Sequence, residues 1–188
     1  MGVVIHPNGW PGSGKLTIAR ELAARLDARV IDSHTLLNPS EALYERHDLA
    51  YGTLRREVRE LIFSHLWRMD QRVPLIFTDA LSDDAWDTKM FDEYRALASA
   101  RRARLVSVVL QCSEEENERR LVSQGRAAQQ KLTRISTLRH LRENYRLLRP
   151  AEVECYTLDV SVMTVDDAAG WIVSSAGLSQ PERRMSGG

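Results

Sequence analysis

The residues with the clearest capacity for chemistry form one glycine-rich stretch, Gly9–Thr17, with the sequence GWPGSGKLT. A short apolar run, Val3–Ile5, precedes it and a helical pattern follows it, so the local order is strand, loop and helix. Glycines allow the positive φ values that turn successive backbone N–H groups inward, and the N-terminus of the next helix adds its dipole. A lysine at the end of such a loop reaches the outer phosphates of a nucleoside triphosphate. The predicted nucleotide-binding residues are Gly9, Pro11, Gly12, Ser13, Gly14, Lys15, Leu16 and Thr17.

One position departs from the usual pattern of such loops. The residue after the lysine is normally Ser or Thr, whose hydroxyl contacts Mg²⁺, but here it is Leu16 and the hydroxyl comes one residue later, at Thr17. We therefore expect ATP and Mg²⁺ to bind, with a weaker contribution of the loop itself to the metal. Asp79 ends an apolar run and is predicted, together with Thr17, to serve the Mg²⁺ site. The alternative for Asp79 is a helix cap.

A second acidic side chain, Asp32, follows another short apolar run. In open parallel sheets, side chains at the carboxyl ends of strands face the ligand crevice, so Asp32 should lie at the same edge as the glycine loop. A carboxylate there can orient or deprotonate an acceptor hydroxyl, although an Asp-Ser pair is also a common helix cap. The predicted substrate contacts are Asp32, His34, Asn38 and Arg55, with His47 as a further candidate. The alternative for Arg55, together with Arg56 and Arg59, is one solvated helix face.

The segment 122–134 carries basic side chains, and positive charge beside the phosphates of a bound nucleotide would neutralise them. Arg126 is the first candidate for this catalytic and nucleotide-binding role, and Lys131 and Arg134 are the next. Each of these side chains has a simpler interpretation as a solvated loop charge. Trp10, inside the glycine loop, either shields the site, packs beside the adenine or fills space in the core.

The elements that must position these residues alternate along the chain between apolar runs and helical patterns. The stretch from residue 35 to residue 52 has a less regular pattern, and a helix is expected from about 53 to 68. Such alternation implies parallel strands joined by right-handed crossovers, in a three-layer α/β/α sandwich with a five-stranded parallel sheet. Strands are expected at 3–6, 28–31, 74–78, 105–110 and 155–160.

Length and composition fit one domain over residues 1–176, followed by a flexible tail at 177–188. The 26 basic and 26 acidic side chains give no net field for nucleic acid, and no apolar stretch is long enough for a membrane span. The two cysteines, Cys112 and Cys155, form no CxxC pair and favour a reducing, cytoplasmic setting. We expect a small-molecule acceptor as partner and a monomer or homodimer.

Over residues 2–175 this order of elements resembles the small P-loop kinases: adenylate kinase, shikimate kinase, gluconate kinase and chloramphenicol phosphotransferase. The loop Gly9–Thr17 matches their phosphate loop, and Ile31-Asp32-Ser33 is similar to the aspartate at the end of their second strand. The resemblance implies a P-loop fold of the nucleoside-monophosphate-kinase type, with a short lid after Arg120. It also implies that Asp32 lies beside an acceptor hydroxyl. The chain has Asp32-x-His34 where shikimate kinase has two acids, which argues against shikimate itself.

The sequence therefore favours an ATP-dependent kinase that transfers the γ-phosphate to a small molecule, more readily to a hydroxyl than to a phosphate. One alternative is a nucleotide-binding regulatory protein or slow ATPase without phosphotransfer, because Leu16 departs from the loop pattern. Another is a nucleoside-monophosphate kinase. No segment of the sequence identifies the acceptor.

Overall fold

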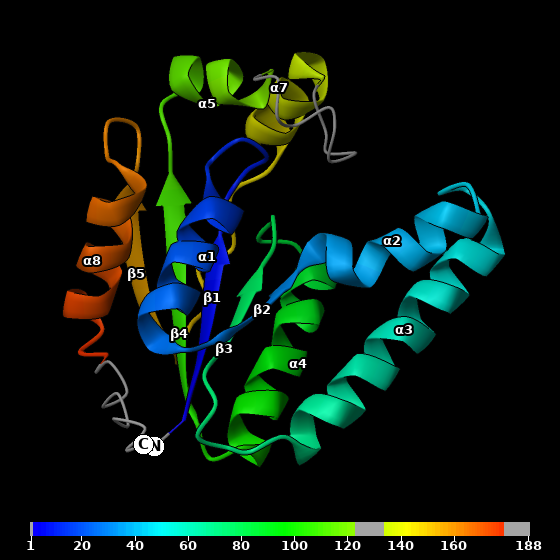
Figure 1. Cartoon of the computed structure of the whole chain (residues 1–188). Helices are drawn as coiled ribbons and strands as arrows, with labels where there is room; N and C mark the ends of the chain where they lie inside the picture. The colour runs from blue at the N-terminus through cyan, green and yellow to red at the C-terminus, as the bar shows by residue number, and fades with distance from the viewer. Residues whose placement is uncertain (1, 123–133, 179–188) are drawn as a thin grey trace, which may run out of the picture.

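The computed structural model describes residues 2–122 and 134–178. A five-stranded sheet with the order β2-β3-β1-β4-β5 forms its centre, and every neighbouring pair of strands is parallel (Figure 1). The strands are β1 (Val3–Asn8), β2 (Arg29–Asp32), β3 (Leu75–Thr78), β4 (Arg104–Gln111) and β5 (Glu154–Asp159). The helices are α1 (Lys15–Leu26), α2 (Ser33–Leu43), α3 (Leu49–Arg68), α4 (Ala85–Ala100), α5 (Glu114–Leu121), α7 (Ile135–Asn144) and α8 (Val165–Ser175).

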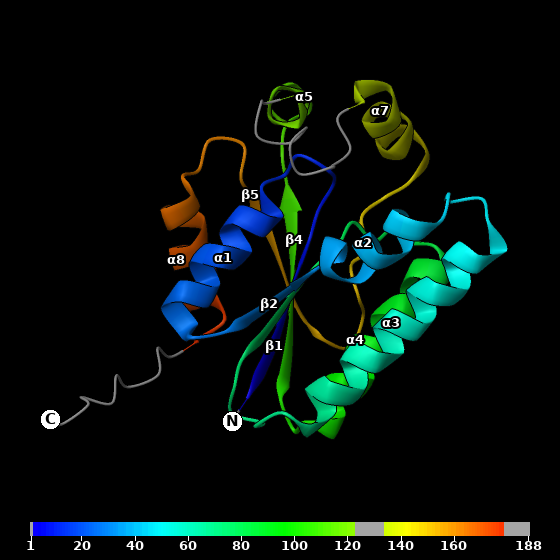
Figure 2. The ribbon, with the colours of Figure 1, turned by 45° about the vertical axis from the view of Figure 1, so that its right-hand side comes forward.

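Helices cover both faces of the sheet, which confirms the predicted three-layer sandwich. Helices α1 and α8 lie on one face, and α3 and α4 lie on the other, while α5 and α7 stand above the carboxyl ends of the strands (Figures 1 and 2). Side chains alternate along β1, so Ile5 joins the apolar cluster under α1 and α8, and Val4 joins the cluster under α3 and α4. Within the described residues, no helix is long and apolar enough to cross a membrane.

The strand register brings the predicted acidic residues to one edge of the sheet. Asp32 pairs with Thr78 at the ends of β2 and β3, and Asp79 forms a parallel bridge with Asn8. The backbone N–H of Gly9 donates to the carbonyl of Asp79 at 3.2 Å. The glycine loop and the two carboxylates therefore start from adjacent strand ends, as the parallel-sheet argument predicts.

A buried amide, Asn8, ties three segments together at this edge. Its Nδ2 donates to the carbonyls of Leu81 at 2.9 Å and Leu148 at 3.3 Å, and its Oδ1 accepts from the N–H of Leu81 at 2.8 Å. Asn8 is the last residue of β1, immediately before the glycine loop. The loop thus begins from a point fixed to the segments that follow β3 and α7.

Residues 35–52, the stretch with the less regular pattern, lie mostly in helices α2 and α3. Helix α2 begins directly after β2, because the Asp32 carboxylate accepts a hydrogen bond from the N–H of Thr35 at 2.9 Å and caps the first turn. Pro39 lies inside this helix. A proline inside a helix normally favours a break, so the local sequence gives little indication of a helix there. Helix α3 also begins at Leu49, earlier than predicted.

The buried face of α3 also differs from the prediction. Arg59, for which a solvated helix face was the alternative interpretation, is only 7% exposed, whereas Leu61 is 62% exposed. Arg59 forms an ion pair with Glu93 of α4, and its guanidinium lies over the rings of Phe63 and Tyr94 at 4.6 and 5.1 Å. A distant acidic partner and two aromatic faces therefore bring this arginine inside, which helical periodicity alone does not reveal.

Strand β1 is longer than predicted. It continues from residue 6 through Pro7 to Asn8, because its pairing with β4 extends to Asn8 and Val109. Helix α7 ends at Asn144, and Tyr145 after it is extended.

The turn between α3 and β3 is held by Arg101, a buried side chain that follows α4. Its guanidinium donates to four backbone carbonyls, those of Leu66 (2.5 Å), Met69 (3.2 Å), Asp70 (2.9 Å) and Val73 (2.9 Å). Because β3 starts just after this turn, Arg101 helps to fix the strand that ends beside Asp79.

Replacing Arg101 with Met should lower the free energy of unfolding by about 3 kcal/mol or more, because several carbonyls lose their donor away from water. Urea denaturation measures the difference. Arg68→Met is the control, since it removes the same group from the exposed end of α3. Equal unfolding midpoints for the two variants would show that the turn does not depend on Arg101.

Candidate active site

The glycine loop has the backbone that phosphate binding requires. Gly12 and Gly14 have φ values of +94° and +87°, in the left-handed region that side chains disfavour. Gly9 has no room for a side chain, because a Cβ there would lie 2.6 Å from the Ser13 hydroxyl and 3.1 Å from the carbonyl of Leu110. All three glycines are thus needed by the geometry.

The N-terminus of α1 opens onto this loop without competing groups of its own. Gly14 is the N-cap residue, no side chain caps the helix, and its first turn carries no acidic residue. The orphan N–H groups and the positive end of the helix dipole therefore remain available to an anion. Lys15 is the first residue of α1, and its ammonium donates to the carbonyl of Trp10 at 3.4 Å.

The two residues after the lysine differ in exposure. Leu16 is half-buried and Thr17 is exposed on α1. The hydroxyl that could serve a metal therefore lies on the solvent side of the helix. Pro11, also in the loop, is half-buried, and its carbonyl accepts a hydrogen bond from Asn117 of α5 at 2.7 Å.

Trp10 serves as packing, one of its three predicted roles. Its ring forms a small apolar cluster with Leu121 of α5 and Leu138 of α7. The Trp10 side chain therefore packs against both helices, so the phosphate loop, α5 and α7 share one apolar cluster.

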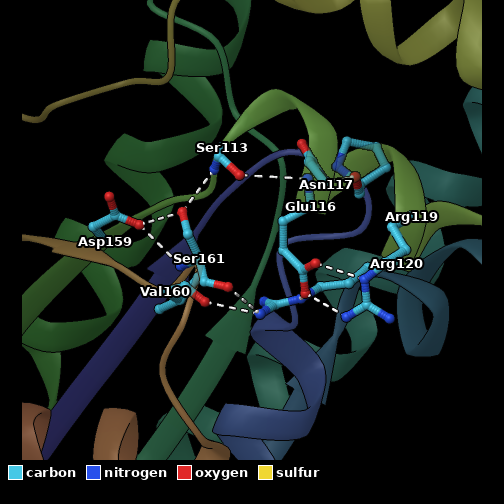
Figure 3. A network of polar contacts seen from close by, with 9 residues as sticks. Ser113, Glu116, Asn117, Arg119, Arg120, Asp159, Val160 and Ser161 are labelled. Atoms are coloured by element: carbon cyan, nitrogen blue, oxygen red, sulfur yellow. Dashed lines mark hydrogen bonds and ion pairs between the residues drawn. The ribbon is translucent and has the colours of Figure 1, made fainter.

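Helix α5 contributes an arginine that sequence reasoning missed. Arg120 donates to the carbonyls of Val160 (2.9 Å) and Ser161 (3.1 Å) and pairs with Glu116 at 2.5 Å (Figure 3). One of its guanidinium nitrogens lies 3.7 Å from the Cβ position of Gly14. Hydrogen bonds from Arg119 and Arg120 lower the pKa of Glu116 to about 2, so the carboxylate stays charged. The i,i+4 spacing of Glu116 and Arg120 was the available signal.

Asp32 is anchored through one oxygen. Its Oδ1 accepts from both the N–H and the hydroxyl of Thr35, at 2.9 and 3.2 Å. The helix-cap interpretation is therefore realised, and within the described residues the hydrogen bonds leave Oδ2 available. A catalytic role for Asp32 is compatible with this geometry and stays a prediction.

Asp79 lies in a polar cluster below the same edge and does not cap a helix. Its Oδ2 accepts from the Tyr94 hydroxyl at 2.6 Å and from His6 Nε2 at 3.2 Å, and its side chain is 15% exposed. Burial by itself raises the pKa of Asp79, but the hydrogen bonds from His6 and Tyr94 and the charges of His6 and Arg59 outweigh it and lower the pKa. The carboxylate is thus held in its anionic form.

Asp79 and Thr17 fit a hydrated Mg²⁺ better than a protein cage. Both hydrogen bonds of Asp79 end on Oδ2, so within the described chain Oδ1 can accept from a metal-bound water. Among the described residues, no group of three or more His, Cys, Asp or Glu side chains could hold a metal ion. Magnesium commonly keeps several waters and binds through substrate phosphates, which suits this sparse donor set.

The predicted substrate contacts lie on α2 and α3. His34 is half-buried in the first turn of α2, and its Nδ1 has no hydrogen-bond partner within the described chain. Asn38 is exposed on the same helix, and Arg55 is half-buried on α3. His47 is exposed between the two helices. These residues share one helical pair beside Asp32, and their contact with an acceptor stays a prediction.

The structure describes only residues 122 and 134 of the segment 122–134, which was predicted to supply positive charge. Arg126 and Lys131 lie outside the described residues, as does the tail from residue 179 onward. Arg134 is the exposed N-cap residue of α7. The predicted placement of an arginine over the transferring phosphate therefore stays a prediction.

The parallel sheet, the left-handed glycines and the lysine at the start of α1 define a P-loop α/β protein of the small-kinase type. The chain belongs to the AAA domain family, whose match extends over residues 4–148. The comparison with curated proteins gives no match. The predicted P-loop kinase fold is confirmed.

Solved structures of similar fold carry the same architecture over nearly their whole length. A gluconokinase from Sinorhizobium meliloti is 17% identical, with a TM-score of 0.56 over 93% of this chain and 95% of that one. A shikimate kinase from Acinetobacter baumannii is 20% identical, with a TM-score of 0.59 over 94% and 95%. The tunicamycin resistance protein of Deinococcus radiodurans is 19% identical, with a TM-score of 0.59 over 96% and 99%. At these identities the likeness establishes the fold.

Removing the Tyr94 hydroxyl as Tyr94→Phe should lower the free energy of unfolding at pH 7 by about 1.5–3 kcal/mol, because a hydrogen bond to a buried carboxylate is lost. The folded-state pKa of Asp79 lies below its unfolded value, so the carboxylate adds stability above the ordinary Asp pKa of about 4 and loses it as the pH falls. The difference between Tyr94→Phe and wild type should therefore shrink in acid.

Urea denaturation at a series of pH values measures this difference. Tyr145→Phe is the control. Tyr145 is 41% exposed, so the loss of its hydroxyl should leave the free energy of unfolding unchanged. A Tyr94→Phe effect that stays constant well below about pH 4 would contradict the assignment of the bond to the charged form of Asp79.

Proposed function

We propose that this protein is an ATP-dependent kinase that transfers the γ-phosphate to a small-molecule acceptor, more readily to a hydroxyl than to a phosphate. One observation carries the proposal: the left-handed glycines of the loop open onto the N-terminus of α1 next to the strand ends that bear Asp32 and Asp79. This places an anion site and two carboxylates at one sheet edge.

The nucleotide phosphates bind at the loop. The backbone N–H groups of residues 12–17 and the Lys15 ammonium are proposed to surround the β- and γ-phosphates, because no side chain caps α1 and the N–H groups of its first turn have no intrahelical acceptor. No acidic side chain in the first turn of α1 repels the phosphates. Arg126 is proposed to add positive charge over the γ-phosphate from the segment between α5 and α7.

The acceptor hydroxyl approaches from the Asp32 side of the edge. Its oxygen forms a bond to the γ-phosphorus while the bond from that phosphorus to the β–γ bridging oxygen breaks, and ADP leaves. The proton of the hydroxyl passes to Asp32, whose Oδ2 is not used by the cap of α2 within the described chain. His34, Asn38 and Arg55 are proposed to orient the acceptor from α2 and α3.

Mg²⁺, when bound with the nucleotide, would neutralise phosphate charge during transfer. Asp79 is the residue proposed to hold one of its waters, through Oδ1, and Thr17 is a weaker second donor on the exposed side of α1. The bonds from Tyr94 and His6 keep the Asp79 carboxylate oriented for this role.

The neighbours in fold support a small-molecule acceptor. Two of them are named gluconokinase and shikimate kinase, and both cover more than nine-tenths of this chain. A carboxylate at the end of β2 is more useful to a hydroxyl, which must lose a proton, than to a phosphate acceptor. We therefore rank a hydroxyl acceptor above a nucleoside monophosphate.

One observation favours a second candidate function, nucleotide binding without phosphotransfer. Asp32 already caps α2, and the half-buried Leu16 stands where a metal-binding hydroxyl is usual. A regulatory protein or slow ATPase would need only the loop. The two candidates differ in whether Asp32 is required for turnover.

Lys15→Ala should abolish a nucleotide-dependent rise in thermal stability, because the lysine contacts the outer phosphates. A ligand at about 100 times its dissociation constant stabilises the native state by about 2.7 kcal/mol, which a thermal-shift series with ATP, ADP, GTP and Mg²⁺ detects easily. Lys89→Ala removes a lysine from the exposed face of α4 and is the control. Wild-type protein that shows no shift with any nucleotide would overturn both candidate functions.

Asp32→Asn should reduce turnover about 10²-fold or more while leaving ATP affinity and thermal stability near the wild-type values. Asparagine caps helices as well as aspartate does, so the substitution removes the base and keeps the first turn of α2. ADP release in a screen of hydroxyl compounds and nucleoside monophosphates measures turnover and also separates the two acceptor classes.

Asp92→Asn is the matched control, because it removes one carboxylate from the exposed side of α4. Unchanged turnover in Asp32→Asn would argue for a different base. Nucleotide binding with no acceptor-dependent ADP release in wild type would favour the non-transferring alternative.

A further inference from the structure

A second polar site lies next to the phosphate loop, on the side of β4 and β5. The structure contains a cavity of about 540 Å³ whose lining includes Trp10, Ser13, Arg142, Arg146, Arg149 and Asp159. Ligand pockets for small molecules commonly have volumes of about 300–1,000 Å³. The cavity is therefore large enough for a metabolite.

The cavity lies at the carboxyl ends of β4 and β5. Leu110 of β4 and Leu158 of β5 pack into the cluster under α1 and α8. The next residue on each strand, Gln111 and Asp159, points to the other face because side chains alternate, and both line the cavity. The phosphate loop continues into α1, and Ser13 of that loop lies in the wall of the cavity, so the cavity adjoins the loop.

The cavity has an excess of positive charge. Three arginines line it, from α7 and the segment after it, against one carboxylate, Asp159. Hydrogen bonds from the hydroxyl and the N–H of Ser161 lower the pKa of Asp159, so this group is a charged acceptor already in use. Arginine remains protonated in proteins, which leaves two positive charges uncompensated.

Arg142 is held in place by Asn117, the same α5 side chain that hydrogen-bonds to the phosphate loop. Arg142 donates through Nη1 to the carbonyl of Cys112 and to Asn117 Oδ1, both at 3.2 Å. Asn117 is 0% exposed, and its Nδ2 donates to the carbonyl of Pro11 at 2.7 Å. This chain of hydrogen bonds connects the cavity to the phosphate loop.

A buried hydroxyl in the wall is the independent sign of a missing ligand group. Ser13 is 1% exposed, and its Oγ has no hydrogen-bond partner within the described residues. A buried donor left unpaired is unfavourable, so it is normally matched by a protein group, a water or a ligand. Within the described residues, the guanidinium groups of Arg146 and Arg149 also form no hydrogen bond or ion pair.

We propose that this cavity binds a small dianion of the phosphate-monoester class, at a site distinct from the nucleotide phosphates. The guanidinium groups of Arg146 and Arg149 would bind the phosphoryl oxygens, because planar forks of N–H donors suit such oxyanions. Arg142 adds charge from its fixed position, and Ser13 lies within the wall as a further donor. The proposal does not rest on kinase activity.

Crystals soaked with selenate, an anomalous scatterer of phosphate-like shape, locate the site directly. The expected result is a selenate ion in the cavity as well as one at the phosphate loop. In Arg146→Gln/Arg149→Gln the cavity ion should disappear while the loop ion remains. The control is Arg56→Gln/Arg68→Gln, which removes two arginines from the exposed face of α3 and should keep both ions.

Calorimetric titration with inorganic phosphate tests the same site in solution. Wild type and the control should bind one more phosphate than the cavity variant, or bind it at least about tenfold more tightly. Selenate at the loop alone, or phosphate binding that the cavity variant retains unchanged, would overturn the proposal. Because the loop ion is scored separately, a failure of the nucleotide site remains distinguishable from a failure of the cavity.

Discussion

The arrangement of this protein depends on the buried amide of Asn8. It hydrogen-bonds in both directions to Leu81 and also to the carbonyl of Leu148, at the point where β1 ends and the phosphate loop begins. A buried amide whose donors and acceptor are satisfied defines one geometry, whereas an apolar residue would tolerate several. The phosphate loop therefore starts from the fixed position of Asn8, and hydrogen bonds hold the segments after β3 and α7 against that residue.

The two acidic residues at this sheet edge, Asp79 and Asp32, are positioned by different contacts. Asp79 follows a fully buried strand, and His6 of β1, Arg59 of α3 and Tyr94 of α4 together hold it as an anion. Asp32 follows a half-exposed strand and is oriented by the first turn of the helix that it caps. In both cases, within the described residues, the hydrogen bonds end on one carboxylate oxygen only. The preorganisation is thus built mainly from contacts outside the loop.

The sequence was most informative where the determinants are local. Three glycines and Lys15 predict the phosphate loop because backbone conformation and charge are written in consecutive residues, and parallel strands then place Asp32 and Asp79 at its edge. Contacts between residues far apart in the sequence could not be predicted from local patterns. Arg59 is buried because Glu93 and Tyr94 meet it from another helix, and the arginine-lined cavity arises only when the segment after α7 folds against β4 and β5. Helix α2 was also not predicted: Pro39 lies within it, and the cap at Asp32 is the local signal that favours a helix there.

The close contact between Gly12 and α5 has a consequence for how the family can vary. A methyl group at Gly12 would lie 2.5 Å from Asn117 Nδ2 and 2.8 Å from the Asn117 carbonyl, while the same amide hydrogen-bonds to the carbonyl of Pro11. Substitution at either position disturbs the other, so their energetic effects are not additive. Related sequences should therefore change Gly12 and Asn117 together or not at all, and a coordinated exchange at these two positions would mark lineages in which the loop has acquired a different support.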